Sequence, residues 1–257
     1  MKIPQLLAIA ALSAAWPQAQ AACNLSFAYN AEPSPPYMVG EATVQAERPG
    51  VAVEMVREAS RRIGCTARFV RLPNVRVLAE TQAGRHDGAF MYSHNPERAA
   101  GLAYPLKDGK PDHDRRIATL RYYLYRLTGS PVEWDGQRLR GLNGAVGVNL
   151  GWSIGRDLKT MGVTVEEALG SRSNLEKLLA GRIAAYATQD LAGDAAVQRW
   201  GQERVERLPA PLSTKDYFVV FNPDFAARQH DTTERFWTAL AELRDEMAAR
   251  LLPLYAE

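Results

Sequence analysis

Hydrophobic positions along the chain alternate between two spacings, one typical of buried strands and one typical of amphipathic helices. Three apolar runs predict strands, at 25–29, 67–72 and 89–92, and two segments between them have helical spacing, at 51–63 and 75–83. Gly64 and Gly84 directly follow the helical segments, in the position where glycine commonly ends a helix. This alternation of strands and helices predicts a parallel sheet in the N-terminal half.

A second unit of the same kind follows. Strands are predicted at 145–149 and 184–188, and helices at 154–161 and 174–180. Ser173 and Glu176 have the spacing of a capping box that opens the second helix. The tripeptide Ala-Gly-Arg closes a helix before a strand in both units, at 83–85 and at 180–182. We interpret the two units as related α/β lobes that face each other.

Two further segments rich in strand-forming residues, 121–127 and 217–221, are predicted to cross between the lobes. The segment 234–252 has no glycine or proline and carries apolar residues along one side, so we expect a long helix that returns to the first lobe. The predicted organisation is a signal peptide at 1–21, a first lobe from 22–120 and 222–257, a second lobe from 121–221, and crossovers near 120–127 and 217–222.

The N-terminus has the parts of a secretory signal peptide. Lys2 supplies positive charge, an apolar stretch follows, and Ala19-Gln20-Ala21 is a small-residue cleavage site. Residues 1–21 are therefore predicted to be removed, which leaves about 235 residues in the periplasm with no membrane span. Of the 31 basic residues only Lys2 is lost, and there are 29 acidic ones. This near balance argues against a nucleic-acid partner and favours a small solute. We expect the protein to be a monomer.

The chain has two cysteines, Cys23 and Cys65, and each stands just before a predicted strand. Parallel neighbouring strands would bring both to the same edge of the sheet, and export implies an oxidising compartment. We therefore predict a disulfide between them. The alternative, a reactive thiol or a metal ligand, has no supporting motif. The four histidines match no metal-ligand spacing, and neither a metal nor another cofactor is predicted.

The segment 84–98 carries the clearest candidate chemistry. Its strand is followed by Asn95 and Pro96, residue types that favour the N-cap and first position of a helix. The exposed backbone N–H groups of a helix start, with the guanidinium of Arg98 beside them, form a site suited to a small carboxylate. The alternative is an arginine that is solvated or paired with a nearby acid.

Several motifs together resemble the bacterial extracellular solute-binding proteins of family 3, the periplasmic components associated with amino-acid ABC transporters. The resemblance covers most of the mature chain. It rests on Pro35-Pro36-Tyr37, Gly84-Arg85-His86-Asp87, Asn95-Pro96-Glu97-Arg98, Ala103-Tyr104-Pro105, Leu139-Arg140-Gly141 and Gly151-Trp152-Ser153. It implies an α/β fold of the type II periplasmic binding protein class, in which two lobes joined by two crossover strands close over a solute.

The resemblance also implies roles for residues of the first lobe. Arg98 takes the place of the arginine that holds the substrate carboxylate. Tyr37 takes the place of an aromatic ring that stacks over the ligand, and Ser93 that of a hydroxyl or backbone contact.

In the second lobe, the resemblance assigns Trp152 and Ser153 to an anion-contacting turn. Asp190, or Gln189 if no insertion is allowed, takes the place of the acid that receives an α-ammonium group. The chain departs from the family at Ala184, where an acid is usual, and Trp152 is bulkier than the usual residue of its turn.

The predicted function is that of a periplasmic solute-binding protein without catalysis, which presents a small carboxylate, such as an amino acid, to an ABC permease. Two alternatives remain. One is a periplasmic dehydratase acting on a cyclic carboxylate, with Glu32 as the general acid. The other is a ligand-sensing module for a membrane receptor.

Overall fold

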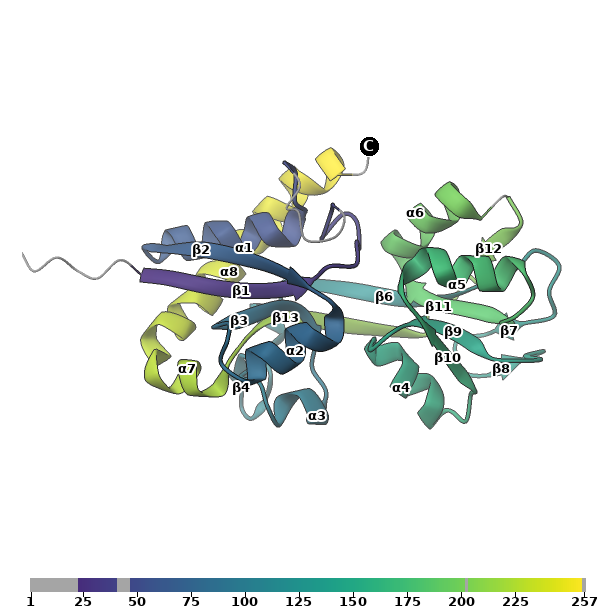
Figure 1. Ribbon diagram of the computed structural model, residues 1–257, viewed down its shortest axis with the longest axis horizontal. Helices are drawn as coiled ribbons and strands as arrows, with labels where there is room; N and C mark the ends of the chain where they lie inside the picture. The colour runs from purple at the N-terminus through teal and green to yellow at the C-terminus, as the bar shows by residue number, and fades with distance from the viewer. Residues whose placement is uncertain (1–22, 41–46, 202, 256–257) are drawn as a thin grey trace, which may run out of the picture.

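The computed structural model describes residues 23–40, 47–201 and 203–255, so the predicted signal peptide at 1–21 lies outside the described residues. Figure 1 shows two lobes side by side, with two long strands running between them. None of the helices within the described ranges is both long and apolar enough to cross a membrane.

One lobe is built around three parallel strands with helices on both faces (Figure 1). Its strands are β1 (Cys23–Asn30), β2 (Cys65–Leu72) and β3 (Gly88–Ser93), with a hairpin of β4 (Leu106–Lys107) and β5 (Lys110–Pro111). Its helices are α1 (Val51–Arg62), α2 (Asn74–Gln82), α3 (Pro96–Ala99), α7 (Pro223–Arg228) and α8 (His230–Leu251), with short 3-10 turns η1 (His113–Arg115) and η2 (Leu252–Tyr255). The long helix α8 packs against α1.

The other lobe repeats the plan. Its strands are β9 (Val146–Asn149), β10 (Val165–Ala168), β11 (Ala185–Gln189) and β12 (Val205–Arg207), with a hairpin of β7 (Glu133–Trp134) and β8 (Leu139–Arg140). Its helices are α4 (Ser153–Thr160), α5 (Gly170–Leu179) and α6 (Asp190–Trp200). Strand β9 pairs in parallel with both β10 and β11.

Strands β6 (Ala118–Leu127) and β13 (Ser213–Phe221) join the lobes. They pair with each other in antiparallel fashion, and the sheet runs in the order β10-β9-β11-β6-β13-β3-β1-β2. Each lobe therefore has parallel strands bordered by one antiparallel crossover strand. The predicted fold of two α/β lobes joined by two crossover strands is confirmed.

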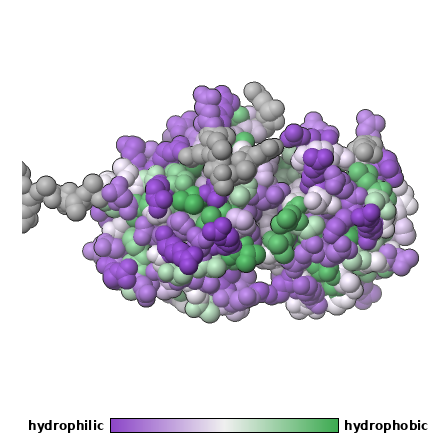
Figure 2. All heavy atoms as spheres, viewed as in Figure 1, coloured by the Kyte–Doolittle hydropathy of each residue, from purple (hydrophilic) through white to green (hydrophobic). Residues whose placement is uncertain are grey.

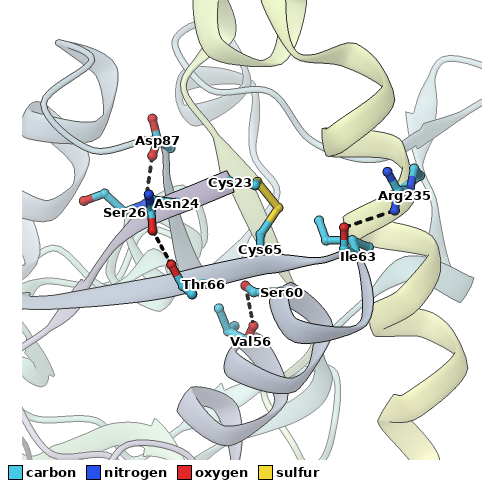
Figure 3. The surroundings of a disulfide bond; sticks show 10 residues. All are labelled: Cys23, Asn24, Ser26, Val56, Ser60, Ile63, Cys65, Thr66, Asp87 and Arg235. Atoms are coloured by element: carbon cyan, nitrogen blue, oxygen red, sulfur yellow. Dashed lines mark hydrogen bonds between the residues drawn. A yellow bond between two sulfur atoms is a disulfide. The ribbon is translucent and has the colours of Figure 1, made fainter. Parts of the chain in front are cut away.

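The predicted disulfide between Cys23 and Cys65 is also confirmed (Figure 3). The two cysteines are direct partners in the parallel pairing of β1 with β2, and their Cα atoms are 4.5 Å apart. The bond closes a loop across 42 positions at the start of both strands.

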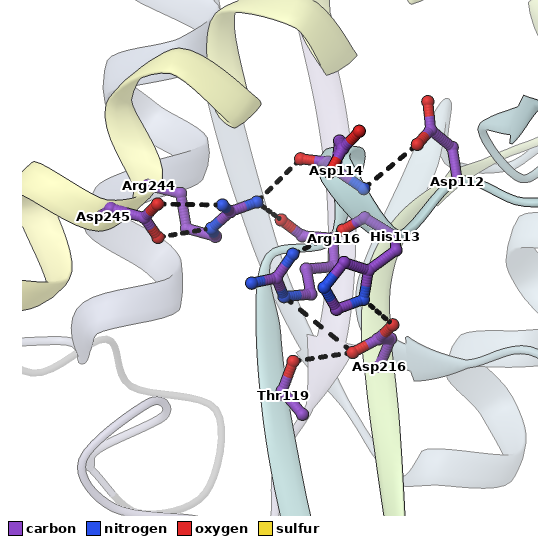
Figure 4. Close-up of polar contacts among 8 residues, drawn as sticks. All are labelled: Asp112, His113, Asp114, Arg116, Thr119, Asp216, Arg244 and Asp245. Atoms are coloured by element: carbon purple, nitrogen blue, oxygen red, sulfur yellow. Dashed lines mark hydrogen bonds and ion pairs between the residues drawn. The ribbon is translucent and has the colours of Figure 1, made fainter.

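A polar cluster ties the crossover strands to the first lobe (Figure 4). The carboxylate of Asp216 on β13 accepts a hydrogen bond from the Thr119 hydroxyl on β6, at 2.6 Å, and lies 2.6 Å from Nδ1 of His113. Arg244 of α8 donates to the carbonyl of Asp114 at 2.7 Å. The charged segment before β6 thus anchors the beginning of the crossover.

Replacing both cysteines by serine should lower the free energy of unfolding by about 4 kcal/mol, because the unfolded chain regains the entropy that the closed loop removes. Denaturant unfolding of the oxidised protein, followed by circular dichroism, measures the difference. The variant should be insensitive to a reductant that destabilises the parent. Equal stabilities would mean that the bond does not form in solution.

Candidate functional site

A small cavity lies where the lobes meet, and we call it the inner pocket. The first lobe contributes Asn30, Ser34, Met38, Asn74, Phe90, Met91, Tyr92, Ser93 and Arg98, the second Trp152, Ser153 and Gln189, and the crossovers Tyr122 and Tyr217. Its volume is about 30 Å³. The carboxyl ends of β1 and β3 open towards it, as is usual for ligand sites in sheets with parallel strands.

Strand register brings four of these residues together. Ser93 on β3 is the partner of Tyr217 on β13, and Gln189 on β11 is the partner of Tyr122 on β6. The two tyrosine hydroxyls are 2.7 Å apart, and Nε2 of Gln189 donates to the Tyr217 oxygen at 2.8 Å. Burial raises the pKa of both tyrosines, so these hydroxyls are neutral at neutral pH.

Arg98 extends from the first turn of α3, a helix start that was predicted correctly. Asn95 is the N-cap and accepts the backbone N–H of Arg98 at 2.9 Å, and Pro96 is the first helical residue. The guanidinium donates through Nη1 to the carbonyl and hydroxyl oxygens of Ser93, at 3.0 and 3.1 Å, and it lies 5.3 Å from the centre of the Tyr92 ring.

The hydrogen-bond acceptors around the Arg98 guanidinium are therefore neutral groups. Its Nη2 donates to the carbonyl of Gly151 at 3.3 Å, and within the described residues no acid forms an ion pair with it. A carboxylate can accept two parallel hydrogen bonds from a guanidinium, and such charge-assisted bonds are about twice as strong as neutral ones. The arrangement can thus favour a carboxylate over the present acceptors.

A β-bulge at Met91 shapes this end of β3. Met91 has a φ of 65° and no partner on β13, because Phe90 pairs with Val219 and Tyr92 with Phe218. In a regular strand Phe90 and Tyr92 would face the same side of the sheet. Here Phe90 packs in one hydrophobic cluster and Tyr92 in another, so the bulge divides their packing between the two clusters.

Ser153 and Trp152 come from the second lobe. Trp152 is the N-cap position of α4 and Ser153 its first residue. The Ser153 hydroxyl lies 3.2 Å from that of Ser93 and accepts a hydrogen bond from Lys215 at 3.0 Å. The hydroxyl thus connects both lobes with a crossover strand.

Lys215 was not identified from the sequence. It lies on β13 with its side chain 17% exposed, and it forms an ion pair with Asp157 of α4. Burial lowers the pKa of Lys215, and the Asp157 carboxylate opposes that shift. The polar run Ser213-Thr214-Lys215-Asp216 resembles ordinary surface, so no local signal separates this lysine from a solvated one.

Two residues predicted to contact a ligand lie elsewhere. Tyr37 is 9% exposed and packs in the main hydrophobic core, while Ser34 and Met38 of the same loop line the pocket. Asp190 begins α6, and its carboxylate pairs with Arg121 at 3.2 Å. Gln189, the alternative named for the same position, lines the pocket instead.

A larger cavity of about 500 Å³ adjoins the inner pocket, and we call it the outer chamber. Asn30, Asn74 and Trp152 line both cavities. Glu32 lines the outer chamber but not the inner pocket. Burial raises the pKa of its carboxyl group, while a hydrogen bond from the backbone of Ser171 near the start of α5 opposes that shift. Among the described residues, no group of His, Cys, Asp and Glu could hold a metal ion.

Comparison with known proteins gives structural matches only. No family model matches the chain, and no curated protein matches its sequence. The glutamate-bound GluR0 ligand-binding core of Nostoc punctiforme is 15% identical, with a TM-score of 0.69 over 90% of this chain and 98% of that one.

Two other matches come from transport and signalling proteins. The arginine-bound amino-acid ABC transporter protein AbpA of Streptococcus pneumoniae is 15% identical, with a TM-score of 0.68 over 91% and 94% of the chains. A histidine kinase sensor domain similar to periplasmic binding proteins is 16% identical, with a TM-score of 0.72 over 90% and 96%. At these identities the chain shares their two-lobed fold.

Direct contacts between the lobes border the site and should influence their separation. Glu97 of α3 forms an exposed ion pair with Arg156 of α4. Replacing Glu97 by lysine turns that attraction into repulsion, so we expect the ratio of closed to open molecules to fall about two- to fivefold. Small-angle scattering would detect the change as a larger radius of gyration.

A matched control is Glu176→Lys, which breaks an equally exposed pair with Arg172 inside one helix. This second variant should leave the scattering unchanged. Identical curves for the parent and Glu97→Lys would show that the Glu97–Arg156 pair does not contribute to closure.

Proposed function

We propose that this protein is an exported solute-binding protein that captures a small carboxylate between its two lobes. The observation that carries the proposal is Arg98, whose guanidinium borders the inner pocket and, among the described residues, donates hydrogen bonds to neutral oxygens of Ser93 and Gly151 and to no carboxylate. A carboxylate reaching this guanidinium would gain charge-assisted hydrogen bonds that these neutral oxygens do not provide.

Binding would couple to lobe closure through groups from both sides. Arg98 and Ser93 belong to the first lobe, and the Ser153 hydroxyl to the second. A solute that contacts both sets favours the closed arrangement by its higher affinity for that state. An ABC permease in the inner membrane, or a membrane receptor, would then recognise the closed form of a periplasmic monomer.

A binding role is favoured over an enzymatic one by the position of Glu32. This acid, the candidate for a dehydratase mechanism, lines the outer chamber and is hydrogen-bonded to the backbone near the start of α5. A general acid must reach the proton that it transfers, within about 3 Å or through one water. Arg98 and Glu32 line different cavities, and none of the described residues that line the inner pocket around Arg98 is acidic.

Replacing Arg98 by alanine should weaken carboxylate binding about 10- to 100-fold, because the bound anion loses its charged donor. Arg98→Lys should retain part of the affinity, since lysine keeps the charge but not the planar pair of donors. Calorimetry of the purified protein against amino acids, dipeptides and other small carboxylates measures both effects.

The matched control is Arg121→Ala, which removes an arginine paired with Asp190 outside the inner pocket. This variant should bind like the parent. The proposal fails if no carboxylate binds, or if Arg98→Ala binds as tightly as the parent. Turnover of a bound compound that is lost in Glu32→Gln would instead favour the enzyme.

A further inference from the structure

The inner pocket is too small to enclose a whole solute in this arrangement of the lobes. Its volume is about 30 Å³. Cavities that enclose small ligands usually measure about 300–1,000 Å³. Beside Arg98 there is room for a head group such as a carboxylate, and the rest of a solute must extend elsewhere.

The outer chamber offers that space, and much of its wall is apolar. At about 500 Å³ it falls within the usual size of a ligand site. Val75 of the first lobe and Leu150 and Leu169 of the second line it, and these side chains are 56%, 42% and 73% exposed. Figure 2 shows hydrophobic residues gathered on both sides of the boundary between the lobes. Clustered exposed apolar residues mark binding surfaces.

Charges around the two cavities do not suit an ammonium group next to the carboxylate. Among the described residues that line the inner pocket none is acidic, and the groups opposite Arg98 are neutral hydroxyls and the amide of Gln189. Lys215, which donates to Ser153, is already paired with Asp157. Burying an ammonium group without a counter-charge is costly, and the nearby guanidinium of Arg98 increases that cost.

The charged residues of the outer chamber each lie beside another group. Glu32 accepts a hydrogen bond from the Ser171 backbone, Arg172 pairs with Glu176, and Arg199 lies over the Trp200 ring. The exposed side chains of Val75, Leu150 and Leu169 can receive an apolar body.

We propose that the solute is a carboxylate with an aryl or alkyl body and no ammonium group on the carbon beside the carboxylate. The carboxylate binds at Arg98, and the body passes Trp152 into the outer chamber. This inference rests on the proposed function and narrows it, because it removes free α-amino acids from the expected ligands.

Three compounds that share a phenyl group test whether the site accepts an ammonium group on the carbon beside the carboxylate. Calorimetry should give measurable binding of 3-phenylpropionate and phenylpyruvate, and binding of L-phenylalanine at least about tenfold weaker, because only the last carries an ammonium group. Propionate, which shares the carboxylate but lacks the ring, should also bind at least about tenfold more weakly than 3-phenylpropionate.

Two variants test the outer chamber from opposite lobes. Val75→Asp and Leu169→Asp each place a carboxylate in its apolar wall, and each should weaken 3-phenylpropionate binding about fivefold or more. Both side chains are largely exposed, so the fold should tolerate the changes. Leu106→Asp, at a leucine that is 51% exposed outside both cavities, is the matched control and should bind like the parent.

The outcomes separate this inference from the proposed function. If L-phenylalanine binds as tightly as 3-phenylpropionate and Arg98→Ala abolishes both, the carboxylate site stands and the inference is wrong. Equal affinities for propionate and 3-phenylpropionate, or unchanged binding in both chamber variants, also overturn it. If no probe binds and no other carboxylate does, both proposals fail.

Discussion

The antiparallel pairing of β6 with β13 is the interaction on which the lobes and the site between them depend. These strands continue the sheet from one lobe into the other, and their outer edges pair with β11 and β3. Because strand pairing fixes register, the side chains of Tyr122 and Tyr217 are brought level with Gln189 and Ser93. The site is therefore assembled by backbone hydrogen bonds before any solute contributes.

Much of the fold could be predicted because its signals are local. Glycines end several helices, and Asn95 caps the turn that carries Arg98. The start of α5 shows where local signals fail. The sequence predicts a capping box at Ser173, yet the helix begins at Gly170 and Glu176 pairs with Arg172. Glu32, from the other lobe, lies near this helix start, and no local pattern contains such a partner.

The side chains that lie around the candidate site could be predicted only in part, again because some of the signals are not local. Arg98, Ser93, Trp152 and Ser153 lie together around the inner pocket. Tyr37 and Asp190 do not line it, and their neighbours in sequence do. A shift of one position moves a side chain to the other face of a strand, or from a strand into the following helix, and the choice between Asp190 and Gln189 needs the tertiary register. Lys215 requires the same three-dimensional information.

The bulge at Met91 has a consequence for how this protein can change over time. Because one unpaired residue determines how the side chains of Phe90 and Tyr92 divide between two packed clusters, the number of residues in this strand matters as much as their identity. Deleting or adding a single position between Gly88 and Ser93 would change, for several side chains at once, which of the two clusters they pack in. Substitutions in β3 can change the contacts of its side chains one at a time, whereas a change in the length of the strand would alter all of them together.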